Sequence, residues 1–117
     1  MVTDLASKGI LLFYAAECGL KAIYMSRNNL RMASDTNSVA VRAASDFGHH
    51  LDELIRQLKI STADVPHTPG KITMSNGQLL SVGQVHEAWR YGGKISEEDR
   101  VLQWLEGALK YAMKELS

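Results

Sequence analysis

Apolar residues recur almost all round the segment Leu5–Met25, which predicts one long helix. One side carries Leu5, Leu12, Phe13, Ala16, Leu20 and Ile23, and the other carries Leu11, Tyr14, Cys18, Ala22 and Met25. Glu17 and Lys21 form the only clearly polar strip, with the spacing of a weak i,i+4 ion pair. A helix of this kind must be covered on several sides. The pattern therefore predicts the central helix of a bundle, or a helix with one face in the core and another in a dimer contact.

A second apolar stripe at helical spacing predicts a helix over Val39–Ile60. The stripe consists of Ala40, Ala44, Phe47, Leu51, Leu54, Ile55 and Leu58, and the opposite, polar side carries Arg42, Asp46, His49, Glu53 and Arg56. Gly48 is a weak point in this helix, so the part before Phe47 is also compatible with a separate turn.

The segment 61–81 lacks helical periodicity. Pro66 and Pro69 each remove a hydrogen-bond donor and restrict the preceding residue. The pair Asn76-Gly77 favours a type I′ turn, because both central residues of that turn need positive φ. The short runs on either side of this pair predict a small β-hairpin within 71–81. The alternative is an irregular loop that contains one tight turn.

The last third of the chain predicts a short helix over Val82–Tyr91 and a longer one that starts at Ser96. Gly92 and Gly93 separate the two helices. Ser96 and Asp99 have the spacing of a weak capping box at the start of the last helix. The apolar stripe of that helix consists of Val101, Leu102, Leu105, Ala108, Leu109, Ala112, Met113 and Leu116.

Together these segments predict an all-α fold, an antiparallel bundle of four to five helices with a small inserted β-hairpin. The length of 117 residues predicts a single domain over 1–117, large enough for its own core. Apolar residues make up 45% of the chain and charged residues 22%, which is typical of a soluble globular protein.

Charge and cysteine content limit which cellular compartments and which classes of partner we expect. Thirteen basic residues balance thirteen acidic ones, so no overall charge favours nucleic acid or a membrane surface. The apolar stretch from Ile10 is interrupted by Glu17 and Lys21, which argues against a membrane span. A lone cysteine fits a reducing compartment, and we expect a cytoplasmic protein in which Cys18 is a buried structural thiol.

Few residues carry chemistry, and no motif indicates a cofactor or a metal. His49 and His50 are adjacent, so they face different directions, and no cysteine or carboxylate cluster completes a metal site. The segment 92–96 (GGKIS) precedes a helix, and with His86, Arg90 and Lys94 it is a candidate anion or nucleotide site. Against this, acidic residues at 97–99 already occupy the start of that helix, so a plain connection is favoured.

Trp89, Arg90 and Tyr91 form a cluster of residue types that are enriched at binding hot spots. The alternative is structural, with Trp89 in the core and Arg90 paired with a carboxylate such as Glu17, and the core role is favoured for Trp89. The exposed hairpin beside these aromatic residues is the candidate surface for protein recognition. Its candidate residues are Met74, Leu79, Leu80, Trp89 and Tyr91.

Several short blocks resemble the HEPN family of helical domains. The segment 15–22 (AAECGLKA) resembles the pattern of that family's first helix, and 50–54 (HLDEL) resembles its second-helix His-Leu block. The segment 89–91 (WRY) is similar to the Arg-Tyr segment before the final helix, and 105–109 (LEGAL) continues in register. The segment Pro66–Val82 departs from the compact family pattern.

The resemblance implies a bundle of four or five helices that usually dimerises, and it raises two activities. Ribonuclease members carry an arginine followed, after four to six residues, by a histidine. No histidine follows Arg90, and the one fit is Arg42 to His49, with six residues between them. On one continuous helix these two residues would lie about 10 Å apart along the axis. A dimer would bring Arg42 and His49 of opposite chains together, with the imidazole as general base and the guanidinium holding phosphate. Non-catalytic members act as binding modules, and this chain is more similar to those.

The leading interpretation is a non-catalytic, HEPN-like protein-interaction module that forms a homodimer through its first helix. We expect a protein partner from a toxin–antitoxin, phage-defence or counter-defence (inhibitor) system. The first alternative is a metal-independent ribonuclease toxin that uses Arg42 and His49, so binding of nucleic acid stays open. The second alternative is a nucleotide-binding module near Arg90 and Lys94.

Overall fold

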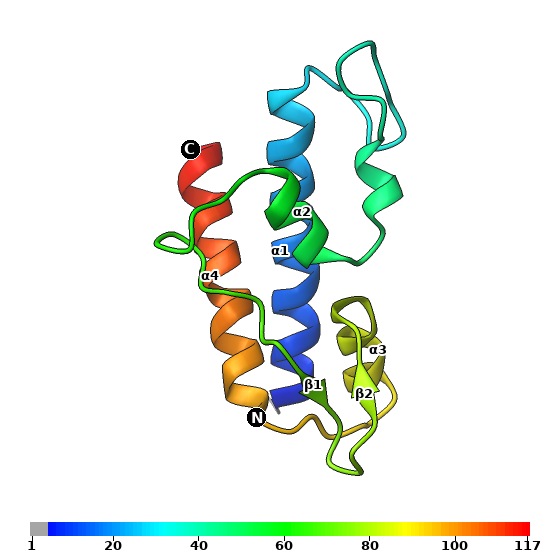
Figure 1. Ribbon diagram of the computed structural model, residues 1–117, viewed down its shortest axis with the longest axis vertical. Coiled ribbons are helices and arrows are strands. Elements are labelled where there is room, and N and C mark those ends of the chain that lie inside the picture. Colours follow the sequence, from blue (N-terminus) through cyan, green and yellow to red (C-terminus); the bar gives the residue numbers. More distant parts are fainter. Residues whose placement is uncertain (1–4) are drawn as a thin grey trace.

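The computed structural model describes residues 5–117 (Figure 1). Its helices are α1 (Leu5–Arg27), α2 (Leu51–Gln57), α3 (Val85–Arg90) and α4 (Glu98–Leu116). Two short 3₁₀ turns, Ala44–Phe47 and Val82–Gln84, precede α2 and α3, and strands β1 (Ile72–Thr73) and β2 (Leu79–Leu80) form a hairpin. The mostly helical fold with a small inserted hairpin confirms the fold class at this level.

The two long helices, α1 and α4, lie side by side and run in the same direction (Figure 1). Lys8 near the start of α1 pairs with Glu106, and Arg27 at its end pairs with Glu115. Between these ion pairs the helices approach closely. A Cβ placed on Gly19 would lie only 2.6 Å from the Cβ of Ala112. The expected antiparallel order therefore does not describe this pair.

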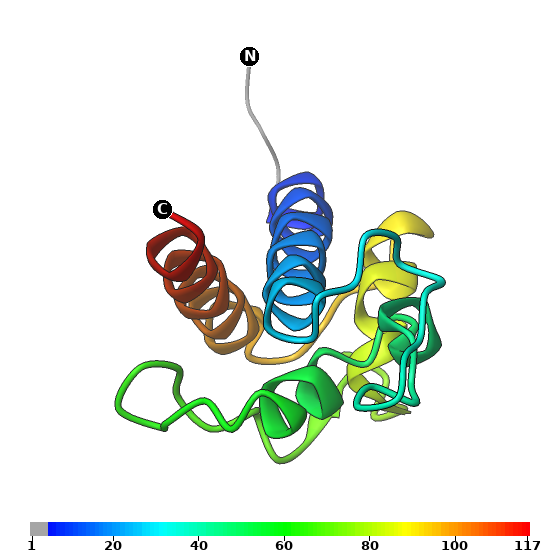
Figure 2. The ribbon, with the colours of Figure 1, turned by 90° about the horizontal axis from the view of Figure 1, so that it is seen from above.

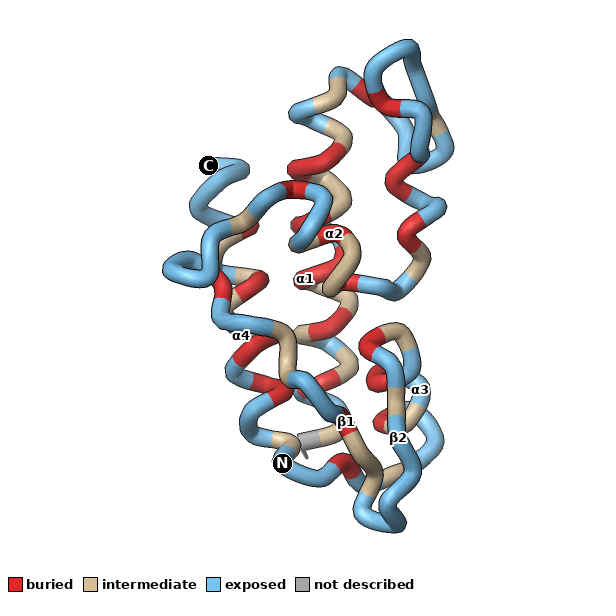
Figure 3. Tube along the Cα trace, viewed as in Figure 1, coloured by how far each residue is buried: buried red, intermediate tan, exposed pale blue. Residues whose placement is uncertain are grey.

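The other flank of α1 is covered by α2 and α3, so this helix is the centre of the fold (Figure 2). Phe13, Ala16 and Leu20 are fully buried along its inner face. Gly9 lies against the indole of Trp89, where a Cβ would be 2.7 Å from the ring. Figure 3 shows how the buried positions gather where α1 faces its neighbours. Helices α2, α3 and α4 thus all pack on α1.

The predicted helix over Val39–Ile60 is wrong in its first half. Only Leu51–Gln57 is α-helical, after the 3₁₀ turn Ala44–Phe47. Gly48 has a φ of +55°, which breaks the helix at the position where the sequence already showed a weak point. Before it, the side-chain oxygen of Asn37 accepts hydrogen bonds from the backbone N–H groups of Val39 and Ala40, which stabilises a loop instead.

The hairpin is present, but its turn is not the predicted type I′. Ile72 pairs with Leu80 and Thr73 with Leu79. The N–H of Gly77 donates to the carbonyl of Met74 at 2.8 Å, and only Gly77, with φ +91°, has positive φ within the turn. A three-residue loop that ends in a left-handed glycine is a common hairpin connection, because that glycine restores the strand twist.

The capping box predicted at Ser96 is also wrong, because α4 begins two residues later. The N–H of Ser96 donates to the carbonyl of Thr73 at 2.7 Å, and Ile95 forms a bridge with Met74. These bonds hold the chain extended beside the hairpin. Glu97, in a left-handed conformation, then precedes the helix and makes no side-chain capping hydrogen bond.

The outer face of α1 is partly uncovered within the described chain, most of all at Leu11 and Cys18. Leu11 is 69% exposed, and Cys18 is exposed as well, so the expectation of a buried structural thiol is wrong. Ala15, Ala22 and Met25 on the same face are half-buried. None of the helices described for residues 5–117 is both long enough and apolar enough to pass through a membrane.

Replacing Gly19 by alanine tests the close contact between α1 and α4. We expect Gly19→Ala to lower the free energy of unfolding by about 1–3 kcal/mol, because the new Cβ would clash with Ala112. Gly107→Ala is the matched control, since its Cβ would lie 3.4 Å from Pro66, an ordinary contact. The control should gain about 0.5–1 kcal/mol from helix propensity. Urea unfolding measures both changes, and equal stabilisation by both substitutions would contradict the contact.

Candidate functional site

The polar strip of α1 is buried in the fold instead of facing solvent. Glu17 is only 9% exposed. The ammonium group of Lys21 lies 3.2 Å from its Oε2, and Nδ1 of His49 lies 2.6 Å from its Oε1. Because a buried carboxylate is costly unless it is paired, both oxygens need these partners. The lone acidic residue of α1 therefore anchors a side chain from a distant segment.

His49 lies in the turn between the 3₁₀ segment and α2, where Gly48 redirects the chain towards α1. A carboxylate at Nδ1 favours the tautomer that carries its proton on that nitrogen. The other ring nitrogen, Nε2, has no hydrogen-bond partner among residues 5–117. The His49 side chain remains 45% exposed. The pair Glu17–His49 thus has the arrangement of an oriented, solvent-accessible general base.

His86, on α3, packs against His49 from the buried side. Its ring centroid lies 4.2 Å from that of His49 and 5.0 Å from that of Phe13. The side chain is 3% exposed, and its Nδ1 is buried without a hydrogen-bond partner. Burial lowers the pKa of His86, and the neighbouring His49 lowers the pKa further. His86 is therefore a neutral wall of the site.

Tyr14 and Arg90 complete the cluster at its solvent side. Arg90, one turn after His86 on α3, donates a hydrogen bond of 2.6 Å to the hydroxyl of Tyr14. The Tyr14 ring has edge contacts with both histidines, at 6.2 Å from His49 and 5.6 Å from His86. We call Tyr14, Glu17, His49, His86 and Arg90 the histidine cluster. It joins a carboxylate, two imidazoles and a guanidinium from three separate segments.

His50 packs beside this cluster because position 83 is a glycine. A Cβ placed on Gly83 would lie 3.1 Å from Cε1 of the His50 ring. The adjacent histidines therefore face different directions, as expected from their spacing: His49 points to α1 and His50 to the turn before α3. No group of three or more histidine, cysteine or acidic side chains suited to a metal ion occurs within the described part of the chain.

Arg42 and His49 have different partners in the structure. The Arg42 guanidinium donates to Oε2 of Glu53 at 2.8 Å and lies 3.9 Å above the ring of Phe47. Its hydrogen bond lowers the pKa of the Glu53 carboxyl. Because the chain between Arg42 and His49 is a 3₁₀ turn and loop instead of an α-helix, the spacing expected for a continuous α-helix does not apply. Arg42 therefore serves mainly to hold the loop before α2.

The candidate protein-binding residues surround the hairpin, with one exception. A cavity of about 220 Å³ lies between the hairpin and α3, and its lining includes Met74, Leu80 and Tyr91. Leu79 and Tyr91 are exposed. Trp89, by contrast, is 2% exposed, and its indole N–H donates to Glu98 at 2.5 Å. The core role favoured for Trp89 is confirmed, and it offers no exposed recognition surface.

The three residues of the candidate anion site are divided between two surroundings. His86 and Arg90 belong to the histidine cluster. Lys94 is exposed, and its backbone carbonyl accepts a hydrogen bond from Ser75 of the hairpin turn. The expected pairing of Arg90 with Glu17 is wrong, since Arg90 bonds to Tyr14 and Glu17 is held by Lys21 and His49.

Sequence reasoning missed the parts that Tyr14 and Glu17 take in the cluster. Tyr14 was counted among the apolar positions, and Glu17 only as half of an ion pair with Lys21. A lone acidic residue on a nearly all-apolar helix was the available signal, because such a carboxylate needs a partner once the helix is buried. Compared with family models, curated proteins and solved structures, the chain matches none.

The lowered pKa of His86 predicts a specific pH dependence of stability. In the unfolded chain His86 takes up a proton near its ordinary pKa of about 6.5, whereas in the folded protein it stays neutral to lower pH. Its contribution to the free energy of unfolding is therefore complete above that pH and decreases as the pH falls through the window below it.

We expect the stability of His86→Leu to fall less steeply on acidification than that of the unsubstituted protein, measured by urea unfolding over a pH series. His67→Leu, at an exposed position, should keep the original dependence. Identical pH profiles for His86→Leu and the unsubstituted protein would show that His86 does not titrate in this way.

Proposed function

We propose that the protein is a non-catalytic helical interaction module that forms a homodimer through the outer face of α1. The observation that carries this proposal is a charge-free seam on that face, in which Leu11 and Cys18 are exposed and the other three residues are partly buried. Leu11, Ala15, Cys18, Ala22 and Met25 follow one another at intervals of four, three, four and three residues. This is the a/d spacing of a coiled-coil contact. We call these five residues the α1 seam.

A second copy of the chain is the occupant that the α1 seam fits best. A two-fold contact requires one surface to be complementary to itself. Leu11, Cys18 and Met25 are the larger side chains of the seam, and the two alanines between them leave room for close approach of a second helix. The exposed Leu11 would gain most from being covered, since burying a leucine contributes roughly 1.5–3 kcal/mol.

The resemblance to HEPN domains supports the same proposal. The blocks that carry it lie far apart in the sequence, yet Glu17 of the first block holds His49 next to the second. Arg90, from the third block, bonds to Tyr14, next to the first block. We infer that the protein partner belongs to a toxin–antitoxin, phage-defence or counter-defence (inhibitor) system, the setting expected for non-catalytic members, in a cytoplasmic location.

Placing a charged residue in the apolar α1 seam tests the dimer. We expect the unsubstituted protein to sediment at about twice its chain mass of 12.9 kDa and Leu11→Asp to sediment as a monomer. Met32→Asp is the matched control, because Met32 is similarly exposed but lies outside the seam. Both substituted positions face solvent in the single chain, so their far-ultraviolet circular dichroism should stay unchanged.

Cys18 supplies an independent measure of the same contact. Because it lies in the middle of the α1 seam, mild oxidation should cross-link the two copies through Cys18, and Leu11→Asp should suppress the cross-link. A protein that stays monomeric at its highest soluble concentration and is not cross-linked more readily than Leu11→Asp would overturn the proposed dimer.

The second candidate function is a metal-independent ribonuclease with His49 as general base. It is favoured by one observation: Glu17 orients the exposed imidazole and leaves Nε2 free. Arg90 is the cation beside this imidazole, through Tyr14, whereas Arg42 is engaged by Glu53 and Phe47. This candidate therefore uses His49 and Arg90 in place of the expected pair Arg42 and His49.

An RNA-cleavage assay separates the two functions. If the ribonuclease candidate is right, the purified protein cleaves RNA, and His49→Ala reduces the rate by about 10²-fold or more, the contribution of a general base. His67→Ala, which lies outside the histidine cluster, should retain the full rate. If the protein is a non-catalytic interaction module, all three proteins should show the same background cleavage. A loss of cleavage in His49→Ala alone would contradict the interaction module and support the ribonuclease.

A further inference from the structure

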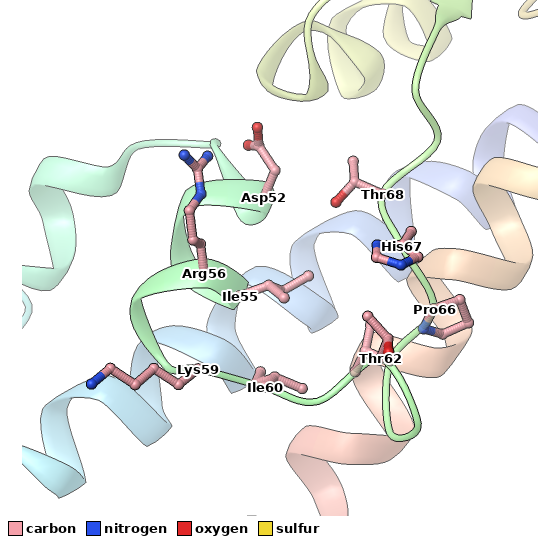
Figure 4. A pocket seen from close by; sticks show the side chains of 10 residues that line it. Asp52, Ile55, Arg56, Lys59, Ile60, Thr62, Pro66, His67 and Thr68 are labelled. Carbon is pink, nitrogen blue, oxygen red and sulfur yellow. The ribbon is translucent and has the colours of Figure 1, made fainter.

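Two hollows of the molecule differ in the charge that they offer to a partner. The larger, of about 420 Å³, lies beside α2, and its lining carries charged side chains of both signs, Asp52, Arg56 and Lys59 (Figure 4). The smaller, of about 220 Å³, lies between the hairpin and α3, and we call it the hairpin groove. Glu87 is the only charged side chain among the described residues that line this groove. The hairpin groove therefore has a single sign of charge, which gives it the clearer preference for a partner.

The hairpin presents one of its two faces to the groove. Leu79 is paired with Thr73, and the side chains of both lie on the same face of the hairpin. Met74, Gln78 and Leu80 lie on the other face, because side chains alternate along a strand, and all three line the groove. A segment bound in the groove would therefore contact the side chain of Leu80 but not the exposed side chain of Leu79.

The groove combines apolar surface with one unpaired carboxylate. Glu87 is exposed on α3, and its side chain makes no hydrogen bond and no ion pair within residues 5–117. The apolar side chains of the lining are Met74, Leu80, Ala88 and Tyr91. Charge complementarity favours a partner that brings a cation to Glu87. The groove thus suits a segment that carries an aliphatic side chain together with a lysine or an arginine.

The edge of the hairpin beside the groove has free backbone groups. The segment 94–96 bonds to Thr73 and covers the outer edge of β1. Met74 donates to the carbonyl of Gln78, so the next pair, Thr73 and Leu79, exchanges no hydrogen bonds, and the N–H and C=O of Leu79 point away from β1. Neither group has a hydrogen-bond partner within residues 5–117. Such groups bind an extended peptide by adding it to the sheet.

We propose that the hairpin groove binds an extended segment of a partner protein in which an aliphatic residue and a lysine or arginine stand two positions apart. The residue between them bonds to the backbone of Leu79. Its two neighbours lie on the groove face beside Gln78 and Leu80, because side chains alternate along a strand. There the aliphatic side chain covers Leu80 and the cation pairs with Glu87. The inference rests on the proposed function as an interaction module, and it names the chemistry of the partner segment.

Four capped pentapeptides test this proposal by nuclear magnetic resonance titration of isotope-labelled protein. In acetyl-Ser-Leu-Thr-Lys-Ser-amide, the first probe, leucine and lysine lie on the same side of an extended chain. In acetyl-Ser-Thr-Leu-Lys-Ser-amide, which has the same composition, they lie on opposite sides, and we expect about fivefold weaker binding or worse. The third probe has glutamate in place of lysine, and the fourth has an N-methylated threonine that cannot donate to Leu79.

The third and fourth probes should also bind about fivefold more weakly than the first, since each lacks one of the proposed contacts. Resonances of 78–80 and 84–91 should shift most with the first probe. Equal affinities for all four probes, no shifts with the first probe, or shifts confined to other parts of the chain would overturn the proposal.

A pair of charge variants tests the contact with Glu87. Glu87→Gln should weaken binding of the first probe about fivefold, because it removes the only charge of the groove. Asp64→Asn is the matched control, since Asp64 is exposed but does not line the groove, and it should leave binding within about twofold. Equal affinities of the two variants for the first probe would contradict the proposed ion pair.

A pair of neighbouring leucines tests which face of the hairpin is used. Leu80→Ala should weaken binding of the first probe about fivefold, whereas Leu79→Ala, on the opposite face, should leave it within about twofold. The amide spectrum of each variant shows whether it is folded. Equal losses in the two variants would contradict binding in the groove.

The hairpin groove and the α1 seam share no residues, so the two proposals fail separately. Leu11→Asp should bind the first probe as tightly as the unsubstituted protein, even though it no longer forms the dimer. Loss of peptide binding in Leu11→Asp would contradict a groove that a single chain forms on its own.

Discussion

The burial of one carboxylate constrains how the rest of the chain surrounds α1. A charged side chain that leaves water costs several kcal/mol unless other groups replace the water. For Glu17 those groups are Lys21 on the same helix and His49 from a turn 32 residues away. His49 in turn packs on His86 of α3. Because buried Glu17 needs partners for its charge, its contact with His49 holds the turn before α2, and through His49 also α3, against the central helix.

This constraint also separates the two surfaces of α1 for which we propose functions. Successive residues of an α-helix point about 100° apart, so Glu17 and Cys18 lie on different faces although they are neighbours in sequence. Glu17 faces the histidine cluster and is buried, whereas Cys18 lies on the exposed α1 seam. A second copy could therefore cover the seam without covering His49. Tyr14, at helical spacing from both Leu11 and Cys18, belongs to the histidine cluster and borders the seam, so the two surfaces meet at this residue.

The elements that the sequence predicted well are those whose stability is local or periodic. α1, α4 and the hairpin follow from repeating apolar positions and from one turn glycine. The predicted helix over Val39–Ile60 had the right apolar period but failed before Leu51. There the side chain of Asn37 and the positive φ of Gly48 stabilise a loop. Periodicity identifies the residues to be buried, and Ala40, Ala44 and Phe47 are indeed buried, but it does not require them to be helical.

The candidate site could be predicted only in part, because its contacts join segments that no sequence period relates. His49, His86 and Arg90 were recognised as residues that could carry chemistry, but His49 was assigned to one site and His86 and Arg90 to another. Their meeting point depends on Tyr14 and Glu17, whose roles appear only when α1 is packed against α3 and the turn before α2.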